Sequence, residues 1–265
     1  MNNMNKIEQR MLDILKELKN EYHVLAIKSE FEAEGSRTDE LVKLNEIVFR
    51  ADVDIYIKIG GCEAVRDLEQ CRILGAKGVM APMIETPFAM KKFIGAVKRV
   101  YTQEEIEQMY YIFNAETITG YNNLDEILRV DDIELIHSIA VGRVDFTASL
   151  GYGRDYINSD EIMKYTRVML EKARKHNIMA GMGGGVSPEA IPVIKQLGDV
   201  LEKFETRKVV FGYTEDLDIK KGLELAMEFE ILYLKNKATL YEKMASDDID
   251  RIKMMEKRLE VIRSM

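Results

Sequence analysis

Two single carboxylates follow two consecutive apolar stretches of the chain. Glu116 comes directly after "YYIFNA", and Asp145 comes directly after "IHSIAVGRV", with a helix-like segment between the two stretches. In one interpretation, Asp145 caps the segment that follows it and Glu116 is a solvated strand end. In the other interpretation, both carboxylates point into one polar cavity. They repel each other there, and a hard divalent cation relieves the repulsion. This second interpretation predicts that Glu116 and Asp145 bind a cation such as Mg²⁺.

Two further motifs offer partners for an anion. The stretch "GYGRDY" at residues 151–156 supplies Arg154, which can clamp a distal acid or phosphate. The stretch "AGMGGGVSP" at residues 180–188 places glycines at a strand end, where barrel proteins bind phosphate through backbone N–H groups. It is not a P-loop, because the Lys and Ser/Thr of that motif are missing. Loop geometry that needs glycine is the alternative explanation of both motifs, so phosphate binding stays open.

The composition excludes several classes of protein. The chain has 265 residues, of which 46% are hydrophobic, enough for one large domain or two small ones. No apolar run approaches the roughly 18 residues of a membrane helix, and the charged N-terminal segment lacks the features of a secretory signal. The formal net charge is −8, and no dense basic cluster indicates nucleic-acid binding. The two cysteines, Cys62 and Cys71, have neither disulfide nor zinc spacing, so we expect a cytoplasmic protein that binds neither membrane nor nucleic acid.

The order of the apolar segments predicts an alternation of strands and helices. Seven segments have the pattern of strands: residues 23–29, 53–61, 76–86, 108–117, 134–145, 177–185 and 207–213. Helices are expected at residues 4–20, 36–51, 62–75, 87–101, 120–130, 158–176 and 187–204, and from residue 218 to the end in at least two pieces. A Ser or Thr is expected to cap the helix at residues 36–51. Pro87 suits the first turn of the helix at residues 87–101.

These elements predict a barrel. The strands are apolar without clean alternation, as in a parallel sheet that is covered on both faces. The chain length favours a TIM-type (β/α)₈ barrel over an open doubly wound sheet, and so do polar residues at the ends of several strands, because those ends converge on one face. The eighth strand is then irregular, missing or replaced by the N-terminal helix. We expect an N-terminal helix at residues 1–22, a catalytic barrel at 23–215 and C-terminal helices at 216–265.

The two carboxylates lie within motifs of a known family. The stretch "IFNAETITGYNNLDEIL", followed by "SIAVGRVDFTASLG", resembles the paired signature of the HpcH/HpaI aldolase / citrate lyase β-subunit family. In that family one strand ends in "IET" and the next strand ends in "G-x-x-D-L-S-x-x-G". The stretch "LGAKGVMAPMIETPFAM" resembles the family's preceding strand and helix. The resemblance runs from about residue 53 to residue 213, and it implies a barrel of the phosphoenolpyruvate/pyruvate superfamily.

The resemblance also implies roles for individual residues. Family members bind Mg²⁺ or Mn²⁺ through the residues that match Glu116 and Asp145, and the metal stabilises the enolate of a pyruvate-type ligand as a Lewis acid. Backbone N–H groups of the "G-x-x-D" turn hold the carboxylate of this ligand. They map to Gly142, Arg143 and Val144 in this chain.

Two positions depart from the family pattern. The basic residue that completes the family's pocket is usually Arg, whereas this chain has Lys58 in "IYIKIGG", which keeps the charge but loses the bidentate fork. The family's first strand carries "G-E-H" with a His that takes part in proton transfer, whereas this chain has "AIKSEFEAEGSR". Glu30, Glu32 and Arg37 are the candidates to replace that His. Ion pairing within the barrel is the alternative for Lys58, and a solvated charged face is the alternative for the other three.

The sequence therefore predicts a metal-dependent carbon–carbon lyase or aldolase that acts on a small 2-oxo acid of the pyruvate or oxaloacetate type. It does not name the acceptor, which is an aldehyde, an acyl-CoA or a sugar acid. One alternative is an aldolase that forms a Schiff base on Lys58 or Lys28. Another alternative is a barrel that binds an oxo acid without catalysing a reaction.

The C-terminal segment predicts a homo-oligomer. Apolar residues of the stretch 218–240 surround much of a helix, which is more than the covering of one barrel requires. The closing stretch repeats apolar residues three to four positions apart, at Ile249, Ile252, Met255, Leu259 and Ile262. Members of the family commonly exchange C-terminal helices between subunits, so the resemblance implies the same. The alternative is that these helices fold back across their own barrel.

Overall fold

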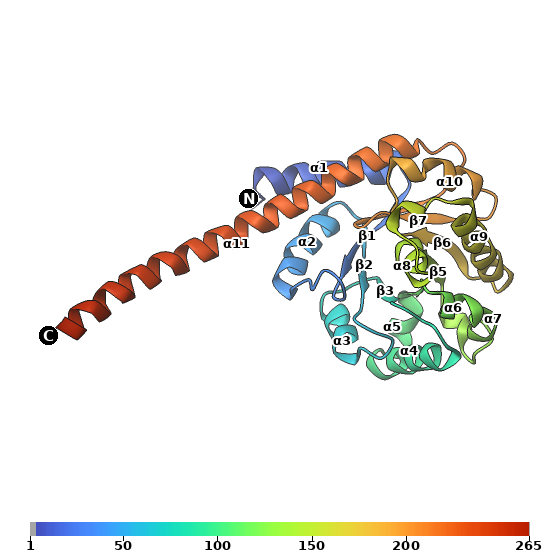
Figure 1. The fold of residues 1–265 in the computed structure, drawn as a ribbon, viewed down its shortest axis with the longest axis horizontal. Coiled ribbons are helices and arrows are strands. Elements are labelled where there is room, and N and C mark those ends of the chain that lie inside the picture. Colours follow the sequence, from blue (N-terminus) through green and yellow to red (C-terminus); the bar gives the residue numbers. More distant parts are fainter. Residues whose placement is uncertain (1–3, 265) are drawn as a thin grey trace.

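The computed structural model of the chain shows a closed barrel of eight strands surrounded by helices (Figure 1). It describes residues 4–264, and for residues 244, 247, 248, 250 and 257–264 it describes the backbone only. The strands follow one another around the barrel in chain order. The predicted TIM-type (β/α)₈ fold is confirmed, and the strand that the sequence pattern did not place is present.

Short strands alternate with helices along most of the chain. The strands are β1 (Val24–Glu30), β2 (Asp54–Lys58), β3 (Gly78–Ala81), β4 (Tyr110–Ala115), β5 (Ser138–Gly142), β6 (Met179–Gly183), β7 (Lys203–Glu205) and β8 (Val209–Gly212). The helices are α1 (Lys6–Glu21), α2 (Thr38–Arg50), α3 (Val65–Ile73), α4 (Pro87–Val100), α5 (Gln103–Gln108), α6 (Ile118–Asn122), α7 (Leu124–Ile127), α8 (Arg143–Ser149), α9 (Asp160–Lys175), α10 (Ile191–Gln196) and α11 (Ile219–Ser264).

Capping residues explain where several helices begin. The Asn5 side chain accepts backbone N–H groups at the start of α1, and Thr86 caps α4 with Pro87 in its first turn, as predicted. The predicted Ser or Thr cap of α2 is wrong. Arg37 occupies that position without a side-chain cap bond, and Glu40 accepts its backbone N–H at 3.3 Å instead.

The eighth strand, β7, lies inside the stretch that the sequence pattern assigned to a helix at residues 187–204. That helix ends at Gln196 as α10, and the chain returns to the barrel as the three residues Lys203–Glu205. β7 forms an antiparallel pair with β8, which is also antiparallel to β1. No helix separates β7 from β8, so the predicted strict alternation is wrong at this point. The pattern missed β7 because two of its three residues are charged although all three are buried.

The inside of the barrel has an apolar floor and a charged upper layer. The floor consists of the buried side chains Ala26, Tyr56, Met80, Ile112, Ala140 and Val210. Two residues further along β1 and β2 stand Lys28 and Lys58, and Asn114 follows the floor residue of β4 at the same interval. Because side chains of a strand alternate between its faces, these polar groups also point into the barrel. The carboxyl ends of the parallel strands therefore enclose a polar site above a packed core.

The C-terminal segment is one continuous helix, so the prediction of at least two pieces is wrong. α11 has 46 residues. Its first part runs beside α1 and its last part extends away from the barrel (Figure 1). Along this contact the Arg10 guanidinium donates two hydrogen bonds to the Glu228 carboxylate, at 2.7 and 2.9 Å. None of the helices among the described residues is long and apolar enough to cross a membrane.

Candidate active site

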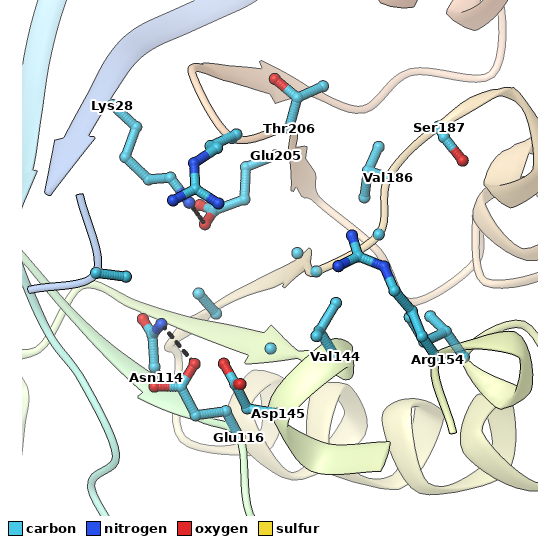
Figure 2. A pocket seen from close by; sticks show the side chains of 18 of the residues that line it. Lys28, Asn114, Glu116, Val144, Asp145, Arg154, Val186, Ser187, Glu205 and Thr206 are labelled. Carbon is cyan, nitrogen blue, oxygen red and sulfur yellow. Dashed lines mark hydrogen bonds and ion pairs between the residues drawn. The ribbon is translucent and has the colours of Figure 1, made fainter. Parts of the chain in front are cut away.

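A cavity of about 970 Å³ opens at the carboxyl ends of the barrel strands. It brings together nine of the residues that the sequence analysis named individually: Lys28, Glu30, Glu32, Lys58, Glu116, Gly142, Val144, Asp145 and Arg154. Figure 2 shows Asn114, Glu116 and Asp145 along one side, with Lys28 and Glu205 across from them. The strand ends therefore converge as predicted, and the cavity is the candidate active site.

Glu116 is held rigidly at the wall of the cavity. Its side chain is only 2% exposed. The backbone N–H of Met83 donates to Oε1 at 3.0 Å, and Asn114 Nδ2 donates to Oε2 at 3.0 Å. Burial raises the pKa of Glu116 above its usual value, the nearby Asp145 raises it further, and the Lys58 ammonium opposes this rise. The carboxylate is therefore an oriented oxygen donor whose negative charge is only partly balanced by the protein.

Gly142, the last residue of β5, leaves the space that Glu116 needs. A Cβ atom at Gly142 would lie 2.5 Å from Glu116 Oε2 and 2.8 Å from Glu116 Cβ. Real side chains essentially never approach so closely. Glycine is therefore required here for the close approach of a neighbouring side chain.

Asp145 reaches the cavity from a helix and not from a strand end. β5 stops at Gly142, and Asp145 stands in the first turn of the seven-residue helix α8. The residue is exposed, and Figure 2 shows its carboxylate beside that of Glu116. An acid in the first turn also suits the helix dipole. The predicted strand of residues 134–145 is thus too long, although the two carboxylates do meet.

Lys58, the last residue of β2, is fixed between two acids. Its Nζ atom lies 3.0 Å from Glu32 Oε2 and 3.5 Å from Glu116 Oε1. Burial alone would lower the pKa of Lys58, but Glu116 and Glu32 outweigh it and raise the pKa above the usual value. The side chain therefore carries a positive charge at the wall of the cavity.

The sequence analysis considered only the backbone N–H of Arg143, and the structure shows where its side chain lies. Its side chain is completely buried and lies outside the cavity lining. Nη2 donates to the carbonyl of Gly184 at 2.9 Å, Nη1 donates to Asn158 Oδ1 at 2.9 Å, and Nε donates to the carbonyl of Gly183 at 3.3 Å. Burial lowers the pKa of this guanidinium to about 10, so it remains charged at neutral pH. The side chain holds the glycine-rich loop against α8.

The glycines of this loop serve backbone geometry. Gly184 and Gly185 have φ values of +72° and +65°, which only glycine adopts without strain. A Cβ at Gly184 would lie 2.8 Å from the backbone N of Arg143 and 2.7 Å from that of Val144. Both glycines line the cavity. The conformational explanation of "AGMGGGVSP" is therefore sufficient.

We expect that Arg143→Met destabilises the fold by about 2–4 kcal/mol, because buried carbonyl oxygens lose their charged donor. Chemical denaturation measures this change in the free energy of unfolding. Arg154→Met is the matched control, since Arg154 is exposed at the cavity rim, and its effect should stay within about 0.5 kcal/mol. Equal stabilities of the two variants would contradict the structural role of Arg143.

Arg37 is not part of the cavity lining. The residue is exposed at the start of α2, and its guanidinium lies 5.0 Å from the centre of the Tyr241 ring of α11. Such a cation–π contact joins α2 to α11. The candidate proton-transfer role of Arg37 is therefore dropped, because the loop after β1 carries the side chain away from the strand ends.

The sequence analysis missed two charged residues of a second wall of the cavity. Glu205, the last residue of β7, and Arg207, in the turn before β8, line it together with Lys28 and Glu30 of β1. Lys28 Nζ lies 2.7 Å from Glu205 Oε1 and 3.6 Å from Glu30 Oε1. The only feature of the sequence that could have indicated this wall was the pair of charged residues in "KFE". The same pattern fits the exposed face of a helix, so it did not predict a buried strand.

These contacts do not favour the Schiff-base alternative on Lys28 or Lys58. Burial lowers the pKa of the Lys28 ammonium, but Glu205 and Glu30 outweigh it and raise the pKa above the usual value. Lys58 has a raised pKa for a similar reason. A nucleophilic lysine must be neutral, whereas both of these are held in their charged form by ion pairs.

Comparisons with known proteins give a family match for the sequence and solved structures with a similar fold. A family model described as HpcH/HpaI aldolase/citrate lyase matches residues 50–186. An HpcH/HpaI aldolase from Desulfitobacterium hafniense is structurally similar, with a TM-score of 0.59 and 14% identity over 77% of this chain and 84% of that chain. The citrate synthase SbnG has a TM-score of 0.59 and 17% identity over 90% of each chain. An HpcH/HpaI aldolase/citrate lyase family protein from Burkholderia cenocepacia has a TM-score of 0.57 and 16% identity over 77% of this chain and 92% of that chain. No curated protein matches the sequence.

Proposed function

Because the chain belongs to the HpcH/HpaI aldolase/citrate lyase family, whose model covers just over half of it, we propose that it is a divalent-metal-dependent carbon–carbon lyase. Its substrate in this proposal is a 2-oxo acid of the pyruvate or oxaloacetate type. The observation that supports it most is the pair Glu116 and Asp145 on one side of the cavity. Both residues lie inside the matched segment.

The donor set fits Mg²⁺ or Mn²⁺. No group of three or more His, Cys, Asp or Glu side chains among the described residues is arranged to hold a metal. Two carboxylates are nevertheless what Mg²⁺ ordinarily takes, with its other positions left to water and substrate oxygens. Asn114 Oδ1 is a further oxygen on the side of the cavity that carries Glu116 and Asp145. It is buried and has no hydrogen-bond partner among the described residues. Glu116 and Asp145 would hold the ion, which would supply positive charge where negative charge develops on the substrate's keto oxygen.

The protein's own residues bind and orient the substrate in this proposal. The Lys58 ammonium is the charged donor for the substrate's carboxylate, which replaces Glu32 as its partner. Gly142 and Val144 bring backbone to the same side of the cavity, and Arg154 stands at the rim for a distal acid. Val144 and Ile157 add apolar surface to the lining, which restricts access of water to the reacting atoms.

Exchange of pyruvate methyl protons with deuterium tests the proposal. We expect NMR to show exchange in the presence of Mg²⁺ or Mn²⁺ and its loss on treatment with EDTA. Borohydride should trap no covalent adduct. Binding of pyruvate without exchange would favour the non-catalytic alternative, and an adduct formed with EDTA present would favour the Schiff-base alternative.

Lys58→Ala should weaken oxo-acid binding more than metal binding. The loss of a charged hydrogen bond to a carboxylate costs about 1.5–3 kcal/mol, or roughly 10- to 150-fold in Kd. Titration calorimetry with oxalate, in saturating Mn²⁺, measures this change. Lys58→Arg serves as the conservative comparison and should recover part of the affinity. Unchanged oxalate affinity in Lys58→Ala would return Lys58 to a purely structural role.

A further inference from the structure

The charged wall opposite Glu116 and Asp145 lies outside the segment that matches the family. Residues 50–186 match the family model, whereas Lys28 and Glu30 precede that segment and Glu205 follows it. All three line the cavity, and Figure 2 shows Lys28 and Glu205 joined by an ion pair across from Glu116. The family match therefore accounts for one side of the site and leaves the role of the other side open.

Glu205 has one oxygen that is held and one that is free. The residue is 4% exposed. Its Oε1 atom accepts a hydrogen bond from Lys28 Nζ at 2.7 Å. Its Oε2 atom is buried and has no hydrogen-bond partner among the described residues. A buried acceptor without a donor destabilises the fold, and more so when it is charged, so this oxygen is a place where a ligand could supply the missing donor.

The groups around Glu205 keep it ionised. Burial raises the pKa of its carboxyl group, but Lys28 of β1, Lys203 of β7 and Lys58 of β2 outweigh this and hold the pKa below its usual value. Glu30, the other acid facing Lys28, lies 3.6 Å from its ammonium. The free oxygen of Glu205 is therefore ionised at neutral pH, the state in which it can accept a proton. Glu32 Oε2 also has no hydrogen-bond partner among the described residues, but it lies 3.0 Å from the Lys58 ammonium.

Lys203 of β7 is the second cation that favours the ionised form of this carboxylate. Its side chain is 1% exposed, and its Nζ atom has no hydrogen-bond partner among the described residues. The side chain crosses the barrel in space that Gly181 leaves, since a Cβ there would lie 2.5 Å from Lys203 Cε. Glycine at position 183 likewise accommodates Glu205, whose Cγ would lie 3.0 Å from an added Cβ. Two strand glycines thus make room for two charged side chains.

We propose that this wall is the subsite for the second reactant, a hydroxyl-bearing fragment, and that Glu205 accepts the proton of its hydroxyl group. The inference rests on the proposed lyase function. In cleavage, the hydroxyl proton moves to Glu205 Oε2 and the oxygen forms the carbonyl of an aldehyde. The electron pair of the breaking carbon–carbon bond passes to the 2-oxo acid fragment, which takes a proton from solvent at that carbon, and Glu205 then releases its proton to solvent. In the addition direction, the protonated Glu205 returns its proton to the new hydroxyl group.

Glycolaldehyde and pyruvate are the probes that test this subsite. Wild-type protein with Mn²⁺ should condense them to a hydroxylated 2-oxo acid, which mass spectrometry detects. Glu205→Gln keeps the size of the side chain and an acceptor for Lys28. It should lower the rate of addition by at least 100-fold more than it lowers pyruvate exchange, because proton transfer by general acid–base catalysis contributes about 10²–10⁴-fold. Glu230→Gln is the matched control: it lines the same cavity from α11 and should leave both rates unchanged.

A pH profile separates this role from a structural one. In the addition direction Glu205 must be protonated, so the addition rate should fall as the pH rises through the pKa of this group. Lys28→Met removes the first of the cations that lower this pKa, so the alkaline limb of the addition rate should move to higher pH. Equal losses of addition and exchange in Glu205→Gln, or an unmoved alkaline limb in Lys28→Met, would overturn the inference. So would a wild-type protein that exchanges pyruvate protons but does not add pyruvate to glycolaldehyde. Absence of exchange in the wild type would instead contradict the proposed lyase function.

Discussion

Glu116→Gln is expected to abolish divalent-metal binding while the barrel remains folded. Glutamine keeps the volume of the side chain, and its amide oxygen still accepts the backbone N–H of Met83 that Oε1 accepts at 3.0 Å. What is lost is the negative charge, and with it the oxygen donor that a hard cation prefers. Asp145→Asn removes the second carboxylate and should have the same effect. Affinity should fall by more than the roughly 10- to 100-fold that loss of an outer partner causes.

Titration with Mn²⁺, followed by electron paramagnetic resonance, measures this loss directly and does not depend on turnover. Asp155→Asn is the matched control, because Asp155 is another exposed carboxylate in the cavity lining. It should keep wild-type affinity. Because burial raises the pKa of Glu116, protons should compete with the metal for this carboxylate at higher pH than for an ordinary glutamate. Wild-type Mn²⁺ affinity in either ligand variant would contradict the assignment of that residue.

The sequence alone predicted that the candidate residues in local motifs would meet at one face of the barrel. Glu116 follows an apolar strand and Asp145 follows the next one, so the topology of a parallel barrel brings them to one face. Lys58 was found by the same logic. Gly142 was assigned a role through its backbone, and the structure adds that its missing side chain makes room for Glu116.

The rest of the site could not be read from sequence because it depends on burial that only the fold creates. Lys203 and Glu205 look like surface residues until β7 is known to lie in the barrel, where their side chains occupy space left by Gly181 and Gly183. The side chain of Arg143 is a further example. The motif assigned a role only to its backbone N–H, whereas the structure adds that its guanidinium donates to carbonyls of the glycine-rich loop. Long charged side chains can point either way from the same backbone, and packing decides the direction.

The extended part of α11 is expected to join two or more copies of the chain. Buried residues early in the helix, such as Leu223, Phe229 and Tyr233, pack on the protein's own barrel and α1. Further along, Ile249, Ile252 and Met255 are about half exposed, at 50%, 55% and 51%. Figure 1 shows this part of the helix extending away from the barrel. An isolated helix without tertiary contacts is marginal in water, and apolar residues spaced three apart form a stripe that suits another helix.

We therefore propose residues 216–265 as an oligomerisation segment, and light scattering of the full chain at micromolar concentration should give at least twice the chain mass of 30.5 kDa. A chain that ends at Met244 should be a monomer with an unchanged unfolding temperature, because it keeps the part of α11 that packs on the barrel. The double change Ile252→Asp and Met255→Asp should also dissociate the oligomer, whereas Arg251→Asp, at an exposed neighbouring position, should not. A full-length monomer would contradict the proposal, and an intact oligomer of the shortened chain would place the contacts elsewhere on the barrel.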